Sequence, residues 1–254
     1  MDKILSHCEK LGVPVIEDAA HSLGTTWRGK NIGTFGRLGC FSFQSYKLLN
    51  SGEGGMLITD DPDCFDKAVV MSGAYEHNWK KHHGERQFFE KWQNQLPLYN
   101  MRLNNLSALI VDSQIPYLDE RIENGRRNHD IAAKKLSHSE WIHVPEKFEH
   151  EARAPDSIQF NLVGLTPLEV SQFCDLINRM GVALQVFGNS KDNARAFWNW
   201  DFLPERFNLP KTRGMLMNAC DVRLPARLNV DDCKSIAEMI LEALRQVKSN
   251  MAAE

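Results

Sequence analysis

The sequence predicts an α/β fold, because helical and strand patterns alternate along it. An amphipathic helix is expected at residues 2–11, and a buried apolar strand follows at 13–16. The acidic residues Glu17 and Asp18 come at the end of that strand. Open α/β sheets bind ligands beyond the carboxyl ends of their strands, so this end of the strand is a candidate site.

A second pair of strands is expected on either side of a polar turn that contains Lys47. These strands are residues 39–43 and 55–59, two apolar runs bounded by glycine and serine. A lysine between two such strands is partly desolvated, which favours the neutral amine that forms Schiff bases with aldehydes and ketones. Most lysines are solvated surface residues, so this stretch alone leaves both interpretations open.

Further elements follow before residue 100. A hairpin is expected at 25–35, and a helix at 61–72 begins at a capping aspartate followed by proline. Residues 73–99 have no periodicity and are expected to form a long loop. Its histidines lack the carboxylate or cysteine spacing of a metal site, so a substrate-facing or solvated loop is favoured over metal binding. These histidines are His77, His82 and His83.

A long helical pattern at 104–136, with a kink expected near Pro116, divides the chain. Helices of this length commonly bridge two domains, and short strands alternate with helices beyond it. We therefore expect domains at 1–112 and 113–254. The elements expected after the long helix are strands at 141–144, 157–162, 182–186 and 220–224, and helices at 167–180 and 230–247.

Composition excludes several classes of protein. The 254 residues are 43% hydrophobic with a formal net charge of −3, and the basic residues are scattered, so nothing indicates nucleic-acid binding. No apolar run approaches the roughly 20 residues that span a bilayer, and the polar N-terminus is not a signal peptide. The six cysteines form no C-x-x-C pair, which favours reduced thiols in a cytoplasmic protein without a cysteine-bound metal.

Asp18 and Lys47 belong to a series of short strings along the chain. The strings are EDAAH at 17–21, GTFG at 33–36, FSF at 41–43, Lys47, and GEGG at 52–55. Their order and spacing resemble the DegT/StrS-type sugar aminotransferases. The segment YNMRLNNLSALI is also similar to the corresponding segment of that family. Tyr46 and Arg37 depart from residues that are common in the family, which leaves the chemistry in place but alters the pocket.

The resemblance implies a pyridoxal phosphate enzyme with the aspartate aminotransferase-like fold. Lys47 would hold the cofactor aldehyde as a Schiff base and move the substrate proton, and Asp18 would keep the ring nitrogen protonated. Ser42 would donate a hydrogen bond to the phosphate, and His21 would contact the ring or its phenolic oxygen. Asn100 would reach the phosphate of a neighbouring subunit's cofactor, which implies a homodimer.

The same resemblance implies the reaction and an incomplete fold. The reaction is transfer of an amino group from glutamate or glutamine to a keto-sugar, expected to be nucleotide-linked; Lys47 argues against the related dehydratases, which carry histidine there. The chain would form an incomplete large domain, with a mostly parallel sheet and helices on both faces, followed by a smaller α/β domain. By the same resemblance, the family's first part, which grips the phosphate, would have no counterpart in this chain. A catalytically silent half-protein that needs a partner chain therefore remains an alternative, as does a non-catalytic module that senses a sugar or the cofactor.

Overall fold

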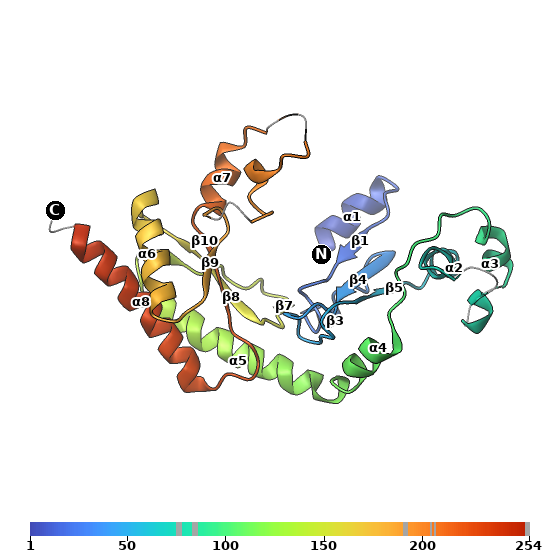
Figure 1. Cartoon of the computed structure of the whole chain (residues 1–254), viewed down its shortest axis with the longest axis horizontal. Helices are drawn as coiled ribbons and strands as arrows, with labels where there is room; N and C mark the ends of the chain where they lie inside the picture. The colour runs from blue at the N-terminus through green and yellow to red at the C-terminus, as the bar shows by residue number, and fades with distance from the viewer. Residues whose placement is uncertain (75–77, 83–85, 190–192, 204, 206, 252–254) are drawn as a thin grey trace. The chain divides into compact units, whose positions relative to one another are not determined.

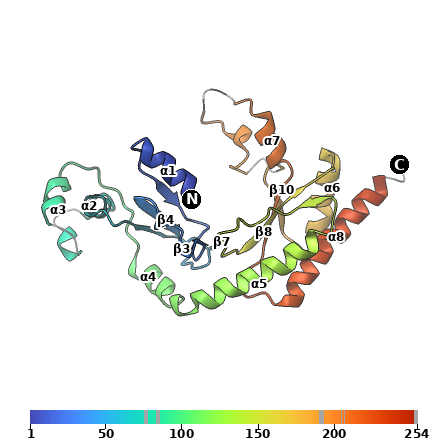
Figure 2. The ribbon, with the colours of Figure 1, turned by 180° about the vertical axis from the view of Figure 1, so that it is seen from behind.

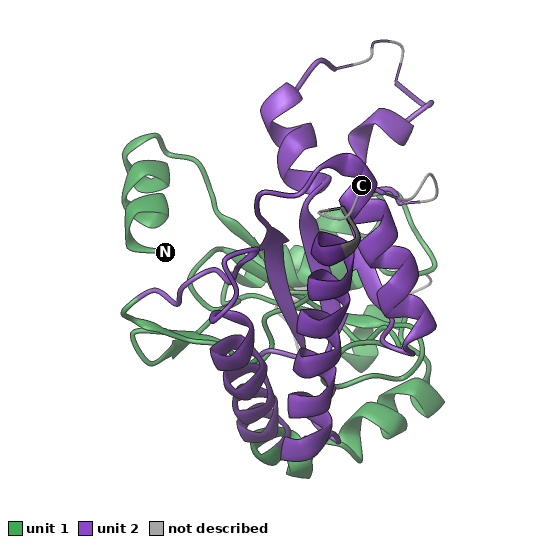
Figure 3. Ribbon diagram, turned by 90° about the vertical axis from the view of Figure 1, so that its left-hand side faces the viewer, with its two compact units in different colours: residues 1–120, 149–154 green, residues 121–148, 155–254 purple. Residues whose placement is uncertain are grey.

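The computed structural model describes residues 1–74, 78–82, 86–189, 193–203, 205 and 207–251, so His77 and His83 lie outside the described residues. Two compact units make up the chain. Unit 1 comprises residues 1–120 and 149–154, and unit 2 comprises 121–148 and 155–254 (Figure 3). The units divide near the start of the interdomain helix, and the domain boundary expected at 112/113 stays a prediction.

Unit 1 contains two small sheets and several short helices (Figure 1). Its described elements are α1 (Asp2–Lys10), β1 (Ile16–Asp18), β2 (Thr26–Trp27), β3 (Lys30–Asn31), β4 (Leu38–Ser42), β5 (Gly55–Ile58), α2 (Pro62–Met71), η1 (Asn78–Lys81), α3 (Arg86–Trp92), α4 (Asn105–Asp112), η2 (Ile115–Tyr117) and β7 (Glu151–Ala152).

The sheet that carries the predicted site has the strand order β1-β4-β5. Strand β1 is parallel to β4, and β5 is antiparallel to it, so one of the two pairings has the direction expected for a mostly parallel sheet. The strand expected at 13–16 is wrong in position, because pairing with β4 begins only at Ile16 opposite Leu38. The preceding residues are apolar, but they have no strand beside them among the described residues.

The hairpin expected at 25–35 is confirmed. Strands β2 and β3 pair antiparallel, and Arg28 and Gly29 between them have φ of 51° and 77°. Two residues with positive φ form the turn that matches the twist of a hairpin. Strand β7 adds to the other side of β2, with Thr26 opposite Ala152.

The prediction that residues 73–99 form one long loop is wrong for the described part of this range. Elements η1 and α3 lie in this range, and Trp79 and Phe89 stack with ring centroids 5.0 Å apart. These rings form a buried cluster with Val70 and Ala74. The aromatic side chains pack through contacts distant in sequence, which helical periodicity does not report.

The break expected in the long helical pattern is confirmed near Pro116. Helix α4 ends at Asp112, η2 spans Ile115–Tyr117, and α5 (Leu118–Leu136) then continues. Proline has no N–H to donate to the preceding turn, so a continuous helix cannot pass through it without losing a hydrogen bond.

Unit 2 packs α-helices against a four-stranded sheet with the order β6-β8-β10-β9, in which every pairing is antiparallel. Figure 2 shows this unit from behind. Besides the larger part of α5, its described elements are β6 (Ile142–His143), β8 (Ser157–Leu162), α6 (Pro167–Arg179), β9 (Leu184–Val186), η3 (Phe197–Asn199), α7 (Pro210–Leu216), β10 (Ala219–Arg223) and α8 (Val230–Met251).

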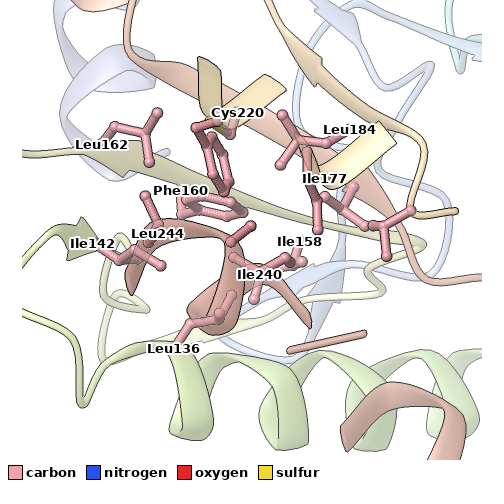
Figure 4. Packing of buried hydrophobic residues seen from close by; sticks show 14 of the residues in the cluster. Leu136, Ile142, Ile158, Phe160, Leu162, Ile177, Leu184, Cys220, Ile240 and Leu244 are labelled. Carbon is pink, nitrogen blue, oxygen red and sulfur yellow. The ribbon is translucent and has the colours of Figure 1, made fainter. Parts of the chain in front are cut away.

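The core of unit 2 lies between this sheet and its helices. Phe160 of β8 packs near Ile240 and Leu244 of α8, and Leu136 of α5 closes the cluster (Figure 4). All four side chains are at most 2% exposed. Burial of such a cluster is the main favourable term in folding, at about 1.5–3 kcal/mol for each large side chain. In the described part of the chain, no helix has the length and apolarity needed to cross a membrane.

Candidate functional site

Two predicted site residues lie at the same edge of the β1-β4-β5 sheet. Asp18 ends β1 opposite Cys40 of β4, and Ser42 ends β4 two residues later. Because β1 and β4 are parallel, their carboxyl ends share one edge. The Asp18 carboxylate is exposed and accepts a hydrogen bond from the Ala20 N–H at 3.1 Å, which caps the turn after β1.

The turn between β4 and β5 presents Lys47. The Lys47 N–H donates to the Gln44 carbonyl at 2.9 Å, and the Tyr46 N–H donates to the Gln44 side-chain oxygen at 3.0 Å. The Ser45 N–H donates across the turn to the Gly52 carbonyl at 2.9 Å. These bonds fix the backbone on both sides of Lys47, so the base of its side chain is held relative to the end of β4.

The structure brings Lys47 and His21 into contact. Lys47 Nζ lies 2.6 Å from His21 Nε2, although the residues are 26 positions apart. Lys47 is half-buried and His21 is exposed. An imidazole nitrogen accepts a proton or a hydrogen bond from an amine, so this contact can orient the Lys47 amine and exchange a proton with it.

The other two predicted residues differ in their surroundings. The Ser42 hydroxyl accepts a hydrogen bond from the Gln44 N–H at 3.3 Å, and its own proton can still be donated. Asn100 is exposed, and its side chain has no hydrogen bond with the described residues. Its neighbours Tyr99 and Met101 donate backbone bonds to the end of α2, at 2.8 and 3.1 Å. Among the described residues, Asn100 therefore forms no hydrogen bond with Lys47 or His21.

Glu17 is a site residue to which the sequence assigned no role. It is 6% exposed, and its carboxylate accepts three backbone N–H bonds from the turn at residues 33–36. The donors are Gly33 at 2.8 Å and Phe35 and Gly36 at 2.6 Å each. Charge-assisted bonds of this kind are among the stronger hydrogen bonds in proteins. The carboxylate thus ties the 33–36 turn to β1, directly before Asp18.

Close backbone contacts at glycines complete this connection. A Cβ on Gly39 would lie 2.0 Å from the Gly33 carbonyl oxygen, and one on Gly36 would lie 2.5 Å from the Val15 carbonyl oxygen. Only glycine allows backbones to approach this closely. The sequence contains a signal for the role of Glu17: an acidic residue inside an apolar strand, together with a G-T-F-G string that can supply backbone donors. A buried carboxylate needs several such donors.

The chemistry of these side chains fits pyridoxal phosphate. Lys47 provides an amine, Asp18 a carboxylate for a ring nitrogen, and Ser42 a hydroxyl for a phosphate oxygen. His21 adds an imidazole beside the amine. In the described part of the chain, no cluster of three His, Cys, Asp or Glu side chains is arranged to hold a metal ion.

Sequence comparison finds curated relatives with similar segments. The chain is 39% identical over 147 residues to the putative pyridoxal phosphate-dependent aminotransferase EpsN of Bacillus subtilis, covering 58% of this chain and 35% of that protein. It is 34% identical over 200 residues to the 3-amino-5-hydroxybenzoate synthase of Amycolatopsis mediterranei, covering 78% and 50%. The chain therefore spans half or less of the length of these relatives.

Solved structures share the fold. PseC of Helicobacter pylori, an aminotransferase involved in pseudoaminic acid biosynthesis, superimposes with a TM-score of 0.81 and 16% identity, covering 96% of this chain and 63% of that one. A 3-amino-5-hydroxybenzoic acid synthase superimposes with a TM-score of 0.77 and 21% identity, covering 96% and 64%. At these identities the likeness concerns the fold alone.

A sequence model of one protein family matches nearly the entire chain. The match is to the DegT/DnrJ/EryC1/StrS aminotransferase family and extends over residues 1–241. It includes both the β1-β4-β5 sheet with Lys47 and the four-stranded sheet of unit 2. This chain belongs to the DegT/DnrJ/EryC1/StrS aminotransferase family.

Proposed function

We propose that this chain carries the catalytic lysine of a pyridoxal phosphate-dependent aminotransferase, and that Lys47 is that lysine. One observation carries the proposal: Lys47 Nζ lies 2.6 Å from His21 Nε2. Lys47 and His21 stand in the segments that follow β4 and β1, the two parallel strands that end in Ser42 and Asp18. An amine, an imidazole, a carboxylate and a hydroxyl from three separate strings of the sequence belong to one sheet edge and the turns that follow it. The membership of the family supports the same assignment.

Each side chain has a distinct task. Lys47 Nζ would be the nucleophile for the cofactor aldehyde and the base that moves the substrate proton. His21 Nε2 contacts that amine and can orient it and exchange a proton with it. The Asp18 carboxylate would favour a proton on the pyridine nitrogen, and the Ser42 hydroxyl would donate to the phosphate. When bound, pyridoxal phosphate supplies the electron sink for the transfer.

The resemblance to the family supports a proposal for the substrate, the amino donor and the assembly. We propose a keto-sugar, nucleotide-linked, as amino acceptor and glutamate or glutamine as amino donor. Among the relatives, one is a GDP-perosamine synthase of Escherichia coli, 30% identical over 147 residues. We further propose a cytoplasmic homodimer in which the exposed Asn100 reaches the partner's cofactor.

Reductive trapping tests the catalytic assignment. Purified protein is incubated with pyridoxal phosphate, reduced with borohydride and digested, and the modified peptide is identified by mass spectrometry. We expect the adduct on Lys47, and we expect it to be lost in Lys47→Ala but retained in Lys10→Ala, a change at an exposed residue of α1. An adduct on another lysine of the wild-type protein, or no adduct at all, would refute the assignment.

A second candidate is a half-protein that acts only with a partner chain. The observation that favours it is exposed apolar side chains on unit 1: Ile16 of β1 and Met56 of β5 are 63% and 45% exposed, and Leu106 and Leu109 of α4 are 69% and 63% exposed. Strands and helices of folded domains bury such side chains against another layer. Light scattering of the purified chain, alone and co-expressed with candidate partners, separates the two. A soluble homodimer with the Lys47 adduct excludes the need for a partner.

A further inference from the structure

The segment that carries Lys47 is held in place by a side chain from a distant part of unit 1. Between β4 and β5, residues 44–50 form turns and bends in place of a strand. A backbone without a neighbouring strand must find other partners for its N–H and C=O groups. Gln114, which follows α4, provides such partners for Asn50, although the two residues are 64 positions apart.

The Gln114 side chain pairs with both backbone polar groups of Asn50. Its Nε2 donates to the Asn50 carbonyl at 2.6 Å, and its Oε1 accepts from the Asn50 N–H at 3.4 Å. Nε2 also donates to the Ile110 carbonyl at 2.8 Å, in the last turn of α4. A side-chain amide has two N–H donors and one oxygen, so these three bonds fix its orientation. Turning the amide over would bring Oε1 against two carbonyl oxygens.

Asn50 connects this paired amide to Lys47. The Asn50 Nδ2 donates to the Lys47 carbonyl at 3.2 Å. Leu49, directly before Asn50, is 4% exposed and packs in a buried cluster with Val111 of α4. The backbone that follows Lys47 is therefore tied to α4 and the turn after it by an apolar contact and by a chain of hydrogen bonds. On the other side, the Lys47 N–H donates to the Gln44 carbonyl.

We propose that Gln114 is a positioning residue for the Lys47 amine and acts through Asn50. The paired amide fixes the Asn50 backbone, and the Asn50 side chain fixes the Lys47 carbonyl. Lys47 Nζ is thereby kept at its 2.6 Å contact with His21 Nε2. The consequence for the reaction rests on the proposed function of Lys47, whereas the fixing of the backbone rests on these contacts alone. A displacement of about 1 Å at a reacting group can slow a reaction severely, so a residue away from the chemistry can control its rate.

Amide hydrogen exchange of the full chain tests the fixing of the backbone and needs no pyridoxal phosphate. Gln114→Met keeps the length of the side chain and removes its polar atoms. We expect the peptide covering residues 45–51 to exchange about fivefold faster or more in this variant, because the segment opens locally more often. Ser113→Ala is the matched control, since it removes a side-chain bond to the same Ile110 carbonyl, at 2.9 Å, that is not part of the chain of contacts to Lys47. In this control the peptide should exchange as in the wild type.

The rate at which Lys47 reacts tests the positioning of its amine. The full chain is mixed with pyridoxal phosphate, samples are reduced with borohydride over time, and each modified peptide is quantified by mass spectrometry. We expect the adduct on Lys47 to form about tenfold more slowly in Gln114→Met and in Asn50→Ala, and at the wild-type rate in Ser113→Ala. Adducts on the exposed Lys10 are the internal reference and should form at one rate in all four proteins. The double variant should be at most about twofold slower than Gln114→Met, because the two residues act in series.

Three results would overturn the proposal. These are unchanged exchange of residues 45–51 in Gln114→Met, an unchanged ratio of the Lys47 and Lys10 adduct rates in that variant, or a double variant slowed by the product of the two single effects. Circular dichroism and the thermal midpoint of each variant establish that it is folded. If Gln114→Met does not fold, the same ratio in Asn50→Ala, whose backbone can still pair with Gln114, decides.

The proposed function fails in a different way. Without any Lys47 adduct in the wild-type protein, the catalytic assignment is refuted, and the exchange measurement alone decides whether Gln114 holds the segment.

Discussion

Replacing Glu17 should destabilise unit 1 more than its single negative charge suggests. The carboxylate serves three N–H donors at once, at 2.6–2.8 Å, inside a site that is 6% exposed. In Glu17→Ala all three donors lose their acceptor, and an unsatisfied buried donor costs about 1–3 kcal/mol. Water can reach the half-buried Phe35 and Gly36, so the full cost of three unsatisfied donors is not expected. We expect the unfolding free energy to fall by about 3–5 kcal/mol, the lower part of the range for three such donors.

Glu17→Gln should have an intermediate effect. Oε1 accepts from Phe35 and Gly36, and Oε2 accepts from Gly33. A glutamine that places its oxygen at Oε1 keeps two bonds without the charge, but its NH₂ group then faces the Gly33 N–H, donor against donor. Because one hydrogen bond is lost and the other two lose their charge, we expect the unfolding free energy to fall by about 2–3 kcal/mol.

Urea denaturation and amide hydrogen exchange check this reasoning. Unfolding free energies are compared for the wild type, both Glu17 variants and Glu9→Gln, a change at an exposed residue of α1 that should stay within about 0.5 kcal/mol of the wild type. Exchange of the peptide covering residues 33–36 should accelerate in the Glu17 variants while peptides of unit 2 keep their protection. If Glu17→Gln matches Glu9→Gln in both measurements, the carboxylate does not hold the turn.

Three further expectations concern other parts of the fold. Gly39→Ala should lower the unfolding free energy by at least about 2 kcal/mol, because its Cβ would lie 2.0 Å from a backbone oxygen. The control Gly214→Ala in α7 meets no atom within 4 Å and should be neutral or slightly stabilising in the same denaturation assay. Equal effects of the two changes would refute the steric argument. The Lys248 ammonium, with help from backbone and hydroxyl groups at the start of α6, lowers the pKa of Glu169 to about 2. A carboxyl whose pKa is lowered on folding stabilises the fold above its ordinary pKa of 4.5 and loses that contribution as the pH falls toward 2. Glu169→Gln should therefore flatten the dependence of unfolding free energy on pH between about 5 and 2, and an unchanged slope would contradict this. Burial raises the pKa of the Cys174 thiol to about 11, so iodoacetamide at pH 8 should label it only after unfolding, as followed by peptide mass spectrometry; rapid labelling in the native protein would show that the thiol is accessible.

The sequence determined the elements that local interactions define. Helix α6 is capped by Thr166. The Thr166 hydroxyl accepts from the Glu169 N–H, and the Glu169 carboxylate accepts from the Thr166 N–H, so this capping signal is contained within four residues. The break at Pro116 and the turn at Gly29 have equally local causes, a missing N–H and a positive φ. The short strings around Asp18 and Lys47 likewise indicated the family, which the comparison over residues 1–241 shows.

Only the tertiary structure decided which distant groups meet. The role of Glu17 depends on donors 16 to 19 residues away, and the Lys47–His21 contact joins residues 26 positions apart. Strand β1 starts at Ile16, not at 13, because its partner begins there. Patterns along a chain report propensity and local capping, whereas pairing, burial and side-chain contact depend on which segment lies opposite, and that is a property of the whole fold.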